Sequence, residues 1–152
     1  MSTKNASLTT AHHDPEPDKK YFSVAEANRA LPYVERVVHD IADVYARIVE
    51  LRRAVEEASA AGGDSETAEA RYETAMDRLS ELVDELHIVG VELKDFEKGL
   101  VDFPALFDGR EIHLCWHQGE EKVDHWHETD AGYAGRQPVS TLHSLPDTPA
   151  AD

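Results

Sequence analysis

Residues 90–138 read GVELKDFEKGLVDFPALFDGREIHLCWHQGEEKVDHWHETDAGYAGRQP and decide the C-terminal half of the fold. The segment holds the only cysteine, both tryptophans and four of the nine histidines of the 152-residue chain. Three short runs in it, GLVDF, REIHLCW and KVDHWHE, are rich in β-branched and aromatic residues, and the turn signals DG and QG separate them. We therefore predict a three-stranded antiparallel β-meander over residues 99–128, followed by a loop over residues 129–138.

Upstream, apolar residues recur at alternating steps of three and four, which is typical of helices that pack along one another. The first series is Val34, Val37, Ile41, Val44, Ile48, Leu51 and Val55, and the second is Tyr72, Ala75, Leu79, Leu82, Leu86, Val89, Leu93 and Phe96. Between them, ASAAGGDSET supplies glycines that end a helix and polar residues that start one. This pattern predicts a long antiparallel, coiled-coil-like helical hairpin over residues 32–98, with arms of about 45 Å at 1.5 Å per residue.

A short helix is expected before the hairpin. Ser23 and Glu26 have the spacing of a capping box, in which each side chain accepts a hydrogen bond from the other residue's backbone amide. Pro32 lacks an amide hydrogen and clashes with the preceding turn, so we predict a helix break near Leu31.

The chain is thus predicted to be an α+β protein, mostly α, with a single domain over residues 21–138. Residues 1–20 are polar and carry two prolines without a hydrophobic period, so a disordered tail is expected there. Residues 139–152 are expected to form a C-terminal tail.

The net charge of −16 excludes broad classes of partner. Phosphate groups are bound by clustered Lys and Arg, so we expect no binding to nucleic acid or to an anionic membrane. The sequence has no apolar run of the roughly 20 residues that span a bilayer and no signal-peptide pattern. One cysteine cannot form an internal disulfide, and we therefore expect a cytoplasmic protein.

Metal-binding residue types gather in the predicted sheet. Strand alternation places His113, Cys115 and His117 on one face, and His125 and His127 share a face of the next strand. Imidazole and thiolate are good ligands for zinc and similar divalent transition metals. The competing interpretation is that the cysteine is a small buried apolar residue and the histidines are ordinary sheet residues.

Carboxylates could complete such a site or perform acid–base chemistry. Glu92 and Asp95 lie three residues apart at the predicted helix end, and Glu120, Glu128 and Asp130 follow in and after the strands. The sequence contains no H-E-x-x-H, no G-x-S-x-G and no phosphate-binding glycine loop, which favours a protein that is not an enzyme.

Arg136 is the only Lys or Arg after residue 122. We expect it to pair with a carboxylate such as Glu128 or Asp130 and to fix the loop, with binding of an anionic ligand as the alternative.

Seven blocks in order resemble the bacterial family called domain of unknown function 2203, over residues 22–138. They are FSVAEANRALP, GVELKD, GLVDFPA, GREIHLCW, GEE, WHE and GRQP. The resemblance implies no reaction. It draws attention to the residues inside the blocks, which are Cys115, Trp116, Glu120, Trp126, His127 and Arg136. A metal site built from Cys115, His127 and a carboxylate is therefore favoured over a histidine-rich strand face.

Two functions follow from these patterns. The first is a non-enzymatic cytoplasmic binding or assembly protein, because the helical heptads need more apolar surface than one hairpin supplies, either from a protein partner or from self-association. The alternative is a metal-binding protein or a metal-dependent hydrolase. Its ligands would come from Cys115, His127, Glu92, Glu120 and Glu128.

Overall fold

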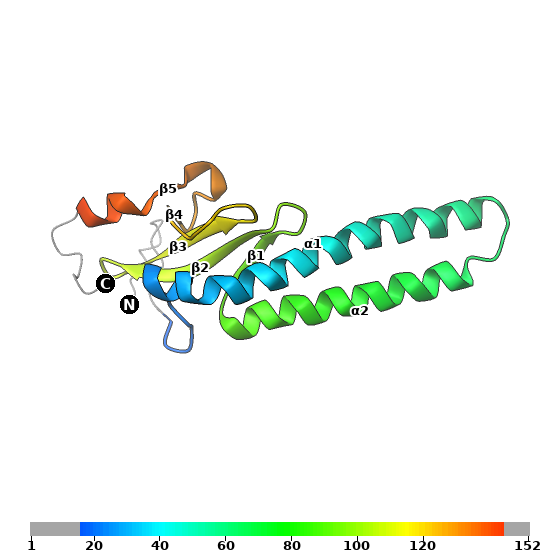
Figure 1. Cartoon of the computed structure of the whole chain (residues 1–152), viewed down its shortest axis with the longest axis horizontal. Coiled ribbons are helices and arrows are strands. Elements are labelled where there is room, and N and C mark those ends of the chain that lie inside the picture. Colours follow the sequence, from blue (N-terminus) through cyan, green and yellow to red (C-terminus); the bar gives the residue numbers. More distant parts are fainter. Residues whose placement is uncertain (1–15, 145–152) are drawn as a thin grey trace, which may run out of the picture.

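The computed structural model describes residues 16–144, and it contains two long helices followed by a five-stranded antiparallel sheet (Figure 1). The elements are α1 (Val24–Ala60), α2 (Glu66–Val89), β1 (Glu92–Asp95), β2 (Leu100–Phe107), β3 (Arg110–His117), β4 (His125–Glu128), the 3-10 helix η2 (Tyr133–Gly135), β5 (Gln137–Pro138) and the 3-10 helix η3 (Val139–Ser144). The predicted helical hairpin and small C-terminal sheet are both present. None of the helices within residues 16–144 combines the length and apolar composition that a membrane span requires.

The start of α1 agrees with the sequence, but the predicted break does not occur. Ser23 Oγ accepts from the amide of Glu26, and the Glu26 carboxylate accepts from the amide of Ser23, which completes the capping box. The break near Leu31 is wrong, because α1 continues through Pro32. Leu31 and Val34 on either side of the proline are buried, so packing of this face holds the helix together across the missing hydrogen bond.

The predicted end of α2 at residue 98 is also wrong. The helix ends at Val89, because Gly90 adopts the left-handed conformation at φ 103°. A Cβ at this glycine would lie 2.9 Å from Cβ of Lys20, so the chain has no room for a side chain here. Leu93 and Phe96 continue the three–four spacing of α2, which is typical of a helix, but residues 92–95 form β1.

The sheet has five strands in sequential order, so the prediction of three was wrong in number. The two additional strands are the edges: β1 lies in the segment assigned to the helix, and β5 has only two residues. The DG turn between β2 and β3 is as predicted, with Asp108 at φ 56° and Gly109 at φ 80°. Short edge strands carry little periodicity, which explains why the sequence did not reveal them.

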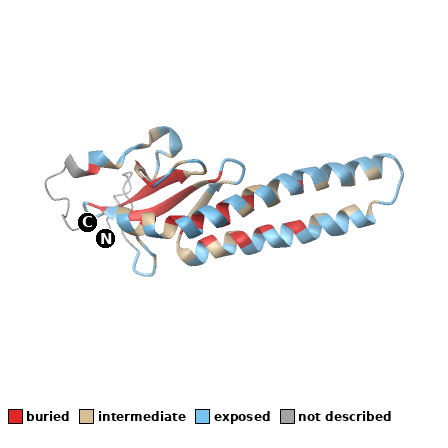
Figure 2. Cartoon of the chain, in the orientation of Figure 1, coloured by how far each residue is buried: buried red, intermediate tan, exposed pale blue. Residues whose placement is uncertain are grey.

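The sheet has one apolar face and one polar face. The apolar face belongs to the hydrophobic core and carries Val101, Phe103, Ala105, Ile112, Leu114, Trp116 and Trp126. Phe22, just before α1, packs edge-on against Phe103 with ring centres 5.2 Å apart. Figure 2 shows buried residues filling the sheet and the near half of the hairpin, while the far half is largely exposed. The helices therefore cover one face and leave the other to shorter segments.

Both expected tails lie mostly outside the described residues. Of the residues that are described, Lys19 contacts the polar face of the sheet, and Leu142 in η3 joins the core at 7% exposure. The contacts of the folded part therefore extend beyond residues 21–138 at both ends.

Candidate metal centre

The polar face of the sheet gathers titratable side chains from three adjacent strands. Asp102 on β2 pairs with Cys115 on β3, and His113 on β3 pairs with His127 on β4. Alternation sends all four side chains to the face opposite the apolar core. All four residues are nevertheless buried.

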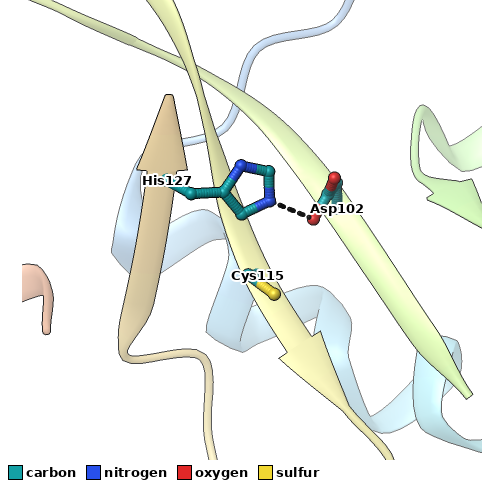
Figure 3. A group of neighbouring side chains, drawn as sticks. All are labelled: Asp102, Cys115 and His127. Carbon is teal, nitrogen blue, oxygen red and sulfur yellow. Dashed lines mark hydrogen bonds and ion pairs between the residues drawn. The ribbon is translucent and has the colours of Figure 1, made fainter. Parts of the chain in front are cut away.

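Asp102, Cys115 and His127 form a compact group in which one donor atom of each lies within 4.8 Å of the others. Figure 3 shows the three side chains projecting from neighbouring strands. Their exposures are 2%, 1% and 3%. A carboxylate oxygen, a thiol sulfur and an imidazole nitrogen thus share a small volume formed by buried side chains.

The hydrogen bonds of His127 fix the roles of its two nitrogens. Nδ1 lies 2.7 Å from the backbone oxygen of Glu128, which can only accept, so Nδ1 carries a proton. Nε2 lies 3.1 Å from Oδ1 of Asp102 and is the nitrogen that faces the group. This arrangement is common for metal-binding histidines, whose second nitrogen donates to a carbonyl or carboxylate.

Without a metal, His127 and Asp102 form a buried ion pair. Burial alone would lower the pKa of His127, but hydrogen bonds to Asp102 and Cys115 raise it to about 10. Burial alone would raise the pKa of Asp102, but the close imidazoles of His113 and His127 bring it down to about 2. The proton on Nε2 therefore occupies the position in which a metal cation would bind.

The same geometry disfavours a nucleophilic cysteine. In a Cys–His–Asp relay the histidine uses one nitrogen for the nucleophile and the other for the carboxylate. Here a single nitrogen, Nε2, faces the group, and Nδ1 is bound to a backbone carbonyl. Cys115 is also only 1% exposed, which denies access to a large substrate. Three donors around one point suit an ion better than a relay.

A second group lies beside the first and already contains a cation. Donor atoms of Glu92, Glu111 and His113 lie within 4.8 Å of one another. Nζ of Lys19 lies 2.7 Å from Oε2 of Glu111 and 3.7 Å from Oε2 of Glu92. Burial opposes ionisation of Glu111, yet hydrogen bonds from Lys19 and His113 hold its pKa below the usual range. The N-terminal segment therefore supplies one positive charge to this group.

His113 connects the two groups. Its Nε2 lies 3.0 Å from Glu111, and its Nδ1 lies 3.3 Å from Oδ2 of Asp102. Nδ1 is buried and makes no hydrogen bond of acceptable geometry. Of the expected metal ligands, Cys115 and His127 therefore meet in one group, while Glu92 belongs to the neighbouring group.

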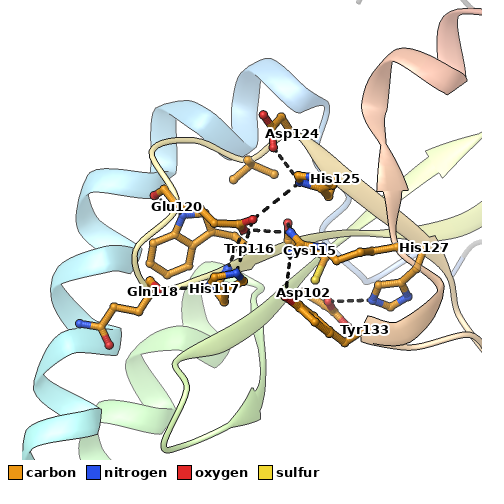
Figure 4. Close-up of polar contacts among 12 residues, drawn as sticks. Asp102, Cys115, Trp116, His117, Gln118, Glu120, Asp124, His125, His127 and Tyr133 are labelled. Carbon is orange, nitrogen blue, oxygen red and sulfur yellow. Dashed lines mark hydrogen bonds and ion pairs between the residues drawn. The ribbon is translucent and has the colours of Figure 1, made fainter.

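Glu120 and Arg136 form a separate contact at the edge of the sheet (Figure 4 shows Glu120). Arg136 Nη2 donates to the Glu120 carboxylate over 2.9 Å and to the backbone oxygen of Cys115 over 3.3 Å. Glu120 also accepts from the amide of His117. Arg136 thus pairs with a carboxylate as expected, although with Glu120 in place of the two expected partners.

Glu128 approaches the centre through its backbone. Its carboxylate binds Arg110 through two hydrogen bonds of 3.1 and 2.6 Å, while its carbonyl oxygen accepts from His127. The tryptophans of the family-like blocks are core residues: Trp116 donates to the Glu120 backbone oxygen, and Trp126 donates to Thr141.

Asp102 is the site residue that the sequence analysis missed. The signal was present in GLVDF, where Asp102 alternates with two apolar neighbours and so faces away from the core. Only strand pairing shows that it lies opposite Cys115, because the sequence gives neither the register nor the order of the strands.

Comparison with known proteins places the chain in a family. A family model described as Uncharacterized conserved protein (DUF2203) matches residues 20–139. The chain belongs to the DUF2203 family. The resemblance noted in the sequence is thereby confirmed, and the matched residues include Asp102, Cys115 and His127. No curated protein and no solved structure matches the chain.

Proposed function

We propose that this DUF2203 protein binds a divalent transition metal, with zinc as the best candidate, through Asp102, Cys115 and His127. The observation that supports the proposal is the convergence of one oxygen, one sulfur and one nitrogen donor within 4.8 Å in a buried position. Mixed sulfur, imidazole and carboxylate ligation suits zinc better than calcium or magnesium, which prefer oxygen alone.

Charge balance supports the same assignment. A thiolate and a carboxylate together neutralise a dication, so the loaded site would have no net charge in a buried environment. Ligands around a tetrahedral zinc lie about 3.3 to 3.8 Å apart, given bond lengths of about 2.0 to 2.3 Å. Donor separations of up to 4.8 Å would therefore need to contract by up to about 1.5 Å when the metal binds.

The direct experiment is a competitive zinc titration against a chromophoric chelator, with untagged protein. We expect one tight equivalent, and at least about a hundredfold weaker binding in Cys115→Ala and His127→Gln, since a lost ligand should cost at least as much as the 10- to 100-fold typical of an outer-shell contact. Glu128→Gln is the matched control, because it keeps the backbone carbonyl that orients His127. A His12→Ala/His13→Ala variant tests whether the histidine pair near the N-terminus contributes metal binding of its own. Wild-type affinity in Cys115→Ala would reject the site.

A second candidate function is association with another protein or with a second copy of this chain, through the far half of the hairpin. An open groove there runs between the helices, with a floor of small and apolar residues such as Val44 and Ala75. The charged residues of the lining are Arg47, Arg71, Arg78 and Glu66, so the groove carries an excess of positive charge in a chain of net charge −16. Val49 and Met76 add exposed apolar surface on the hairpin at 43% and 41%. An acidic surface, including that of this chain, would complement the groove.

Light scattering after size exclusion tests self-association. A dimer that dissociates in Arg71→Glu/Arg78→Glu, but persists in Arg52→Glu/Arg53→Glu outside the groove lining, would support this role. A protein that is monomeric at every concentration would exclude self-association, and the partner would then be a different protein. The proposed place of action is the cytoplasm, where a thiol such as Cys115 stays reduced.

A further inference from the structure

A small cavity of about 190 Å³ borders the candidate metal centre. Asp102 and His127 line it, so two of the three proposed ligands face both the metal position and the cavity. His113, Lys94, Leu100 and Tyr133 form other parts of the wall. An ion held between Asp102 and His127 would therefore lie next to space that solvent and small molecules can occupy.

We propose that the bound metal keeps one coordination position for a small anion, which enters through this cavity. The inference rests on the metal-binding function proposed above and extends it from a structural ion to a ligand-binding one. Structural zinc sites are closed by four protein ligands, whereas reactive sites have three protein ligands and one exchangeable position. The distinction therefore depends on whether a fourth protein donor is present.

Among the described residues, His113 is the candidate that could close the site, and its contacts hold it elsewhere. Its Nε2 is bound to Glu111, which Lys19 and Tyr21 also hold. Its Nδ1 approaches Asp102 at 3.3 Å, but His113 is not one of the three residues whose donor atoms all lie within 4.8 Å of one another. Recruiting His113 as a ligand would break a buried hydrogen bond, so an exogenous ligand is favoured.

The charge in the cavity wall selects an anion. Lys94 lies on β1, with Nζ 3.2 Å from Oε1 of Glu92 and its side chain 45% exposed. Its ammonium group can reorient to meet a ligand at modest cost, since such exposed ion pairs are weak. An anion placed between the metal and Lys94 would contact two positive centres. The cavity, at about 190 Å³, has room for small anions such as azide, bicarbonate or acetate.

Cobalt substitution tests this inference. Co²⁺ replaces Zn²⁺ in similar ligand sets and gives visible absorption bands that report its coordination. We expect a thiolate-to-cobalt band in the loaded protein, and a saturable change in the cobalt bands on addition of azide or acetate. Lys94→Gln should weaken azide binding about two- to fivefold, because an exposed charge contact contributes about that much to affinity. The affinity for cobalt should not change.

A cavity-filling variant supplies the second arm. Leu100→Trp should abolish the azide response while the thiolate-to-cobalt band persists. Leu106→Trp is its matched control, because Leu106 lies on the same face of β2, is 45% exposed, and should retain the response. Cobalt bands that keep the thiolate signature but ignore azide would overturn the inference alone. Absence of the thiolate band would instead reject the metal site itself, so the two failures are distinguishable.

Discussion

Nε2 of His127 on β4 lies 3.1 Å from Oδ1 of Asp102 on β2, so the two side chains meet above the strand that separates them. That strand, β3, contributes Cys115 directly opposite Asp102. A histidine, a carboxylate and a thiol therefore converge, although Asp102 and His127 are 25 residues apart in the sequence. The sheet order, and not proximity along the chain, builds this centre.

The ion pair makes the stability of the metal-free protein depend on pH. The pKa of His127 is about 10 in the fold against 6.5 for the free group, so its contribution is complete below about 6.5 and disappears as the pH rises through about 10. The pKa of Asp102 is about 2 against 3.8, so its contribution is complete above 3.8 and disappears as the pH falls through 2.

We therefore expect the pair to stabilise the metal-free protein most between about pH 4 and 6.5. Urea unfolding with a chelator present, at pH 5, 7 and 9, measures this dependence. The double variant Asp102→Asn/His127→Gln replaces the ion pair with a neutral hydrogen bond and is the reference. If wild type and variant lose stability in parallel from pH 7 to 9, the raised pKa of His127 is refuted.

Zinc should stabilise the folded protein by mass action. At free zinc a thousandfold above Kd, the gain in unfolding free energy is about 4 kcal/mol. The midpoint temperature of thermal unfolding should rise when zinc is added and fall back to its original value with excess chelator. Cys115→Ala should show a much smaller shift; an equal shift in this variant would locate the metal elsewhere.

Removal of Lys19 should leave the buried carboxylate of Glu111 without its closest cation. We expect Lys19→Met to lower the unfolding free energy by about 1 to 3 kcal/mol, the usual penalty for an unsatisfied buried polar group. Lys19→Met/Glu111→Gln should recover part of the loss, and Lys122→Met on the exposed surface should have little effect. A double-mutant cycle in urea measures the coupling, and additive effects would contradict the contact.

Pro32→Ala should stabilise α1. Pro32 is exposed, so its removal costs little packing, and alanine restores the amide that can donate to the carbonyl of Asn28. The expected gain is about 1 to 3 kcal/mol of unfolding free energy. Glu35→Ala, at an exposed site in the same turn, controls for helix propensity. Destabilisation by Pro32→Ala would mean that the core requires the proline's local geometry.

The helical hairpin and the central β2–β3 hairpin could be predicted because each is marked by local chemistry. The capping box at Ser23, the glycines after α1 and the DG turn each specify their own backbone conformation. The boundary of α2 could not be predicted from periodicity, since Leu93 continues the three–four spacing. Gly90 ends the helix, and its tight contact with Lys20 depends on tertiary packing.

The sequence predicts the residue types of the site, but only some of the individual residues that form it. Cys115 and His127 stand out by chemistry, whereas Asp102 is one of 31 acidic residues and is selected only by strand register. Glu120 and Glu128 have the same chemistry as Asp102, but they pair with Arg136 and Arg110. Charge pairing of this kind depends on three-dimensional distance, which sequence spacing does not supply.

X-ray absorption spectroscopy of the zinc-loaded protein tests the metal centre most directly. The Asp102–Cys115–His127 site predicts one sulfur neighbour at about 2.3 Å and nitrogen or oxygen neighbours at about 2.0 to 2.2 Å. The sulfur shell should disappear in Cys115→Ala. A zinc shell of nitrogen and oxygen alone in the wild-type protein would contradict the site.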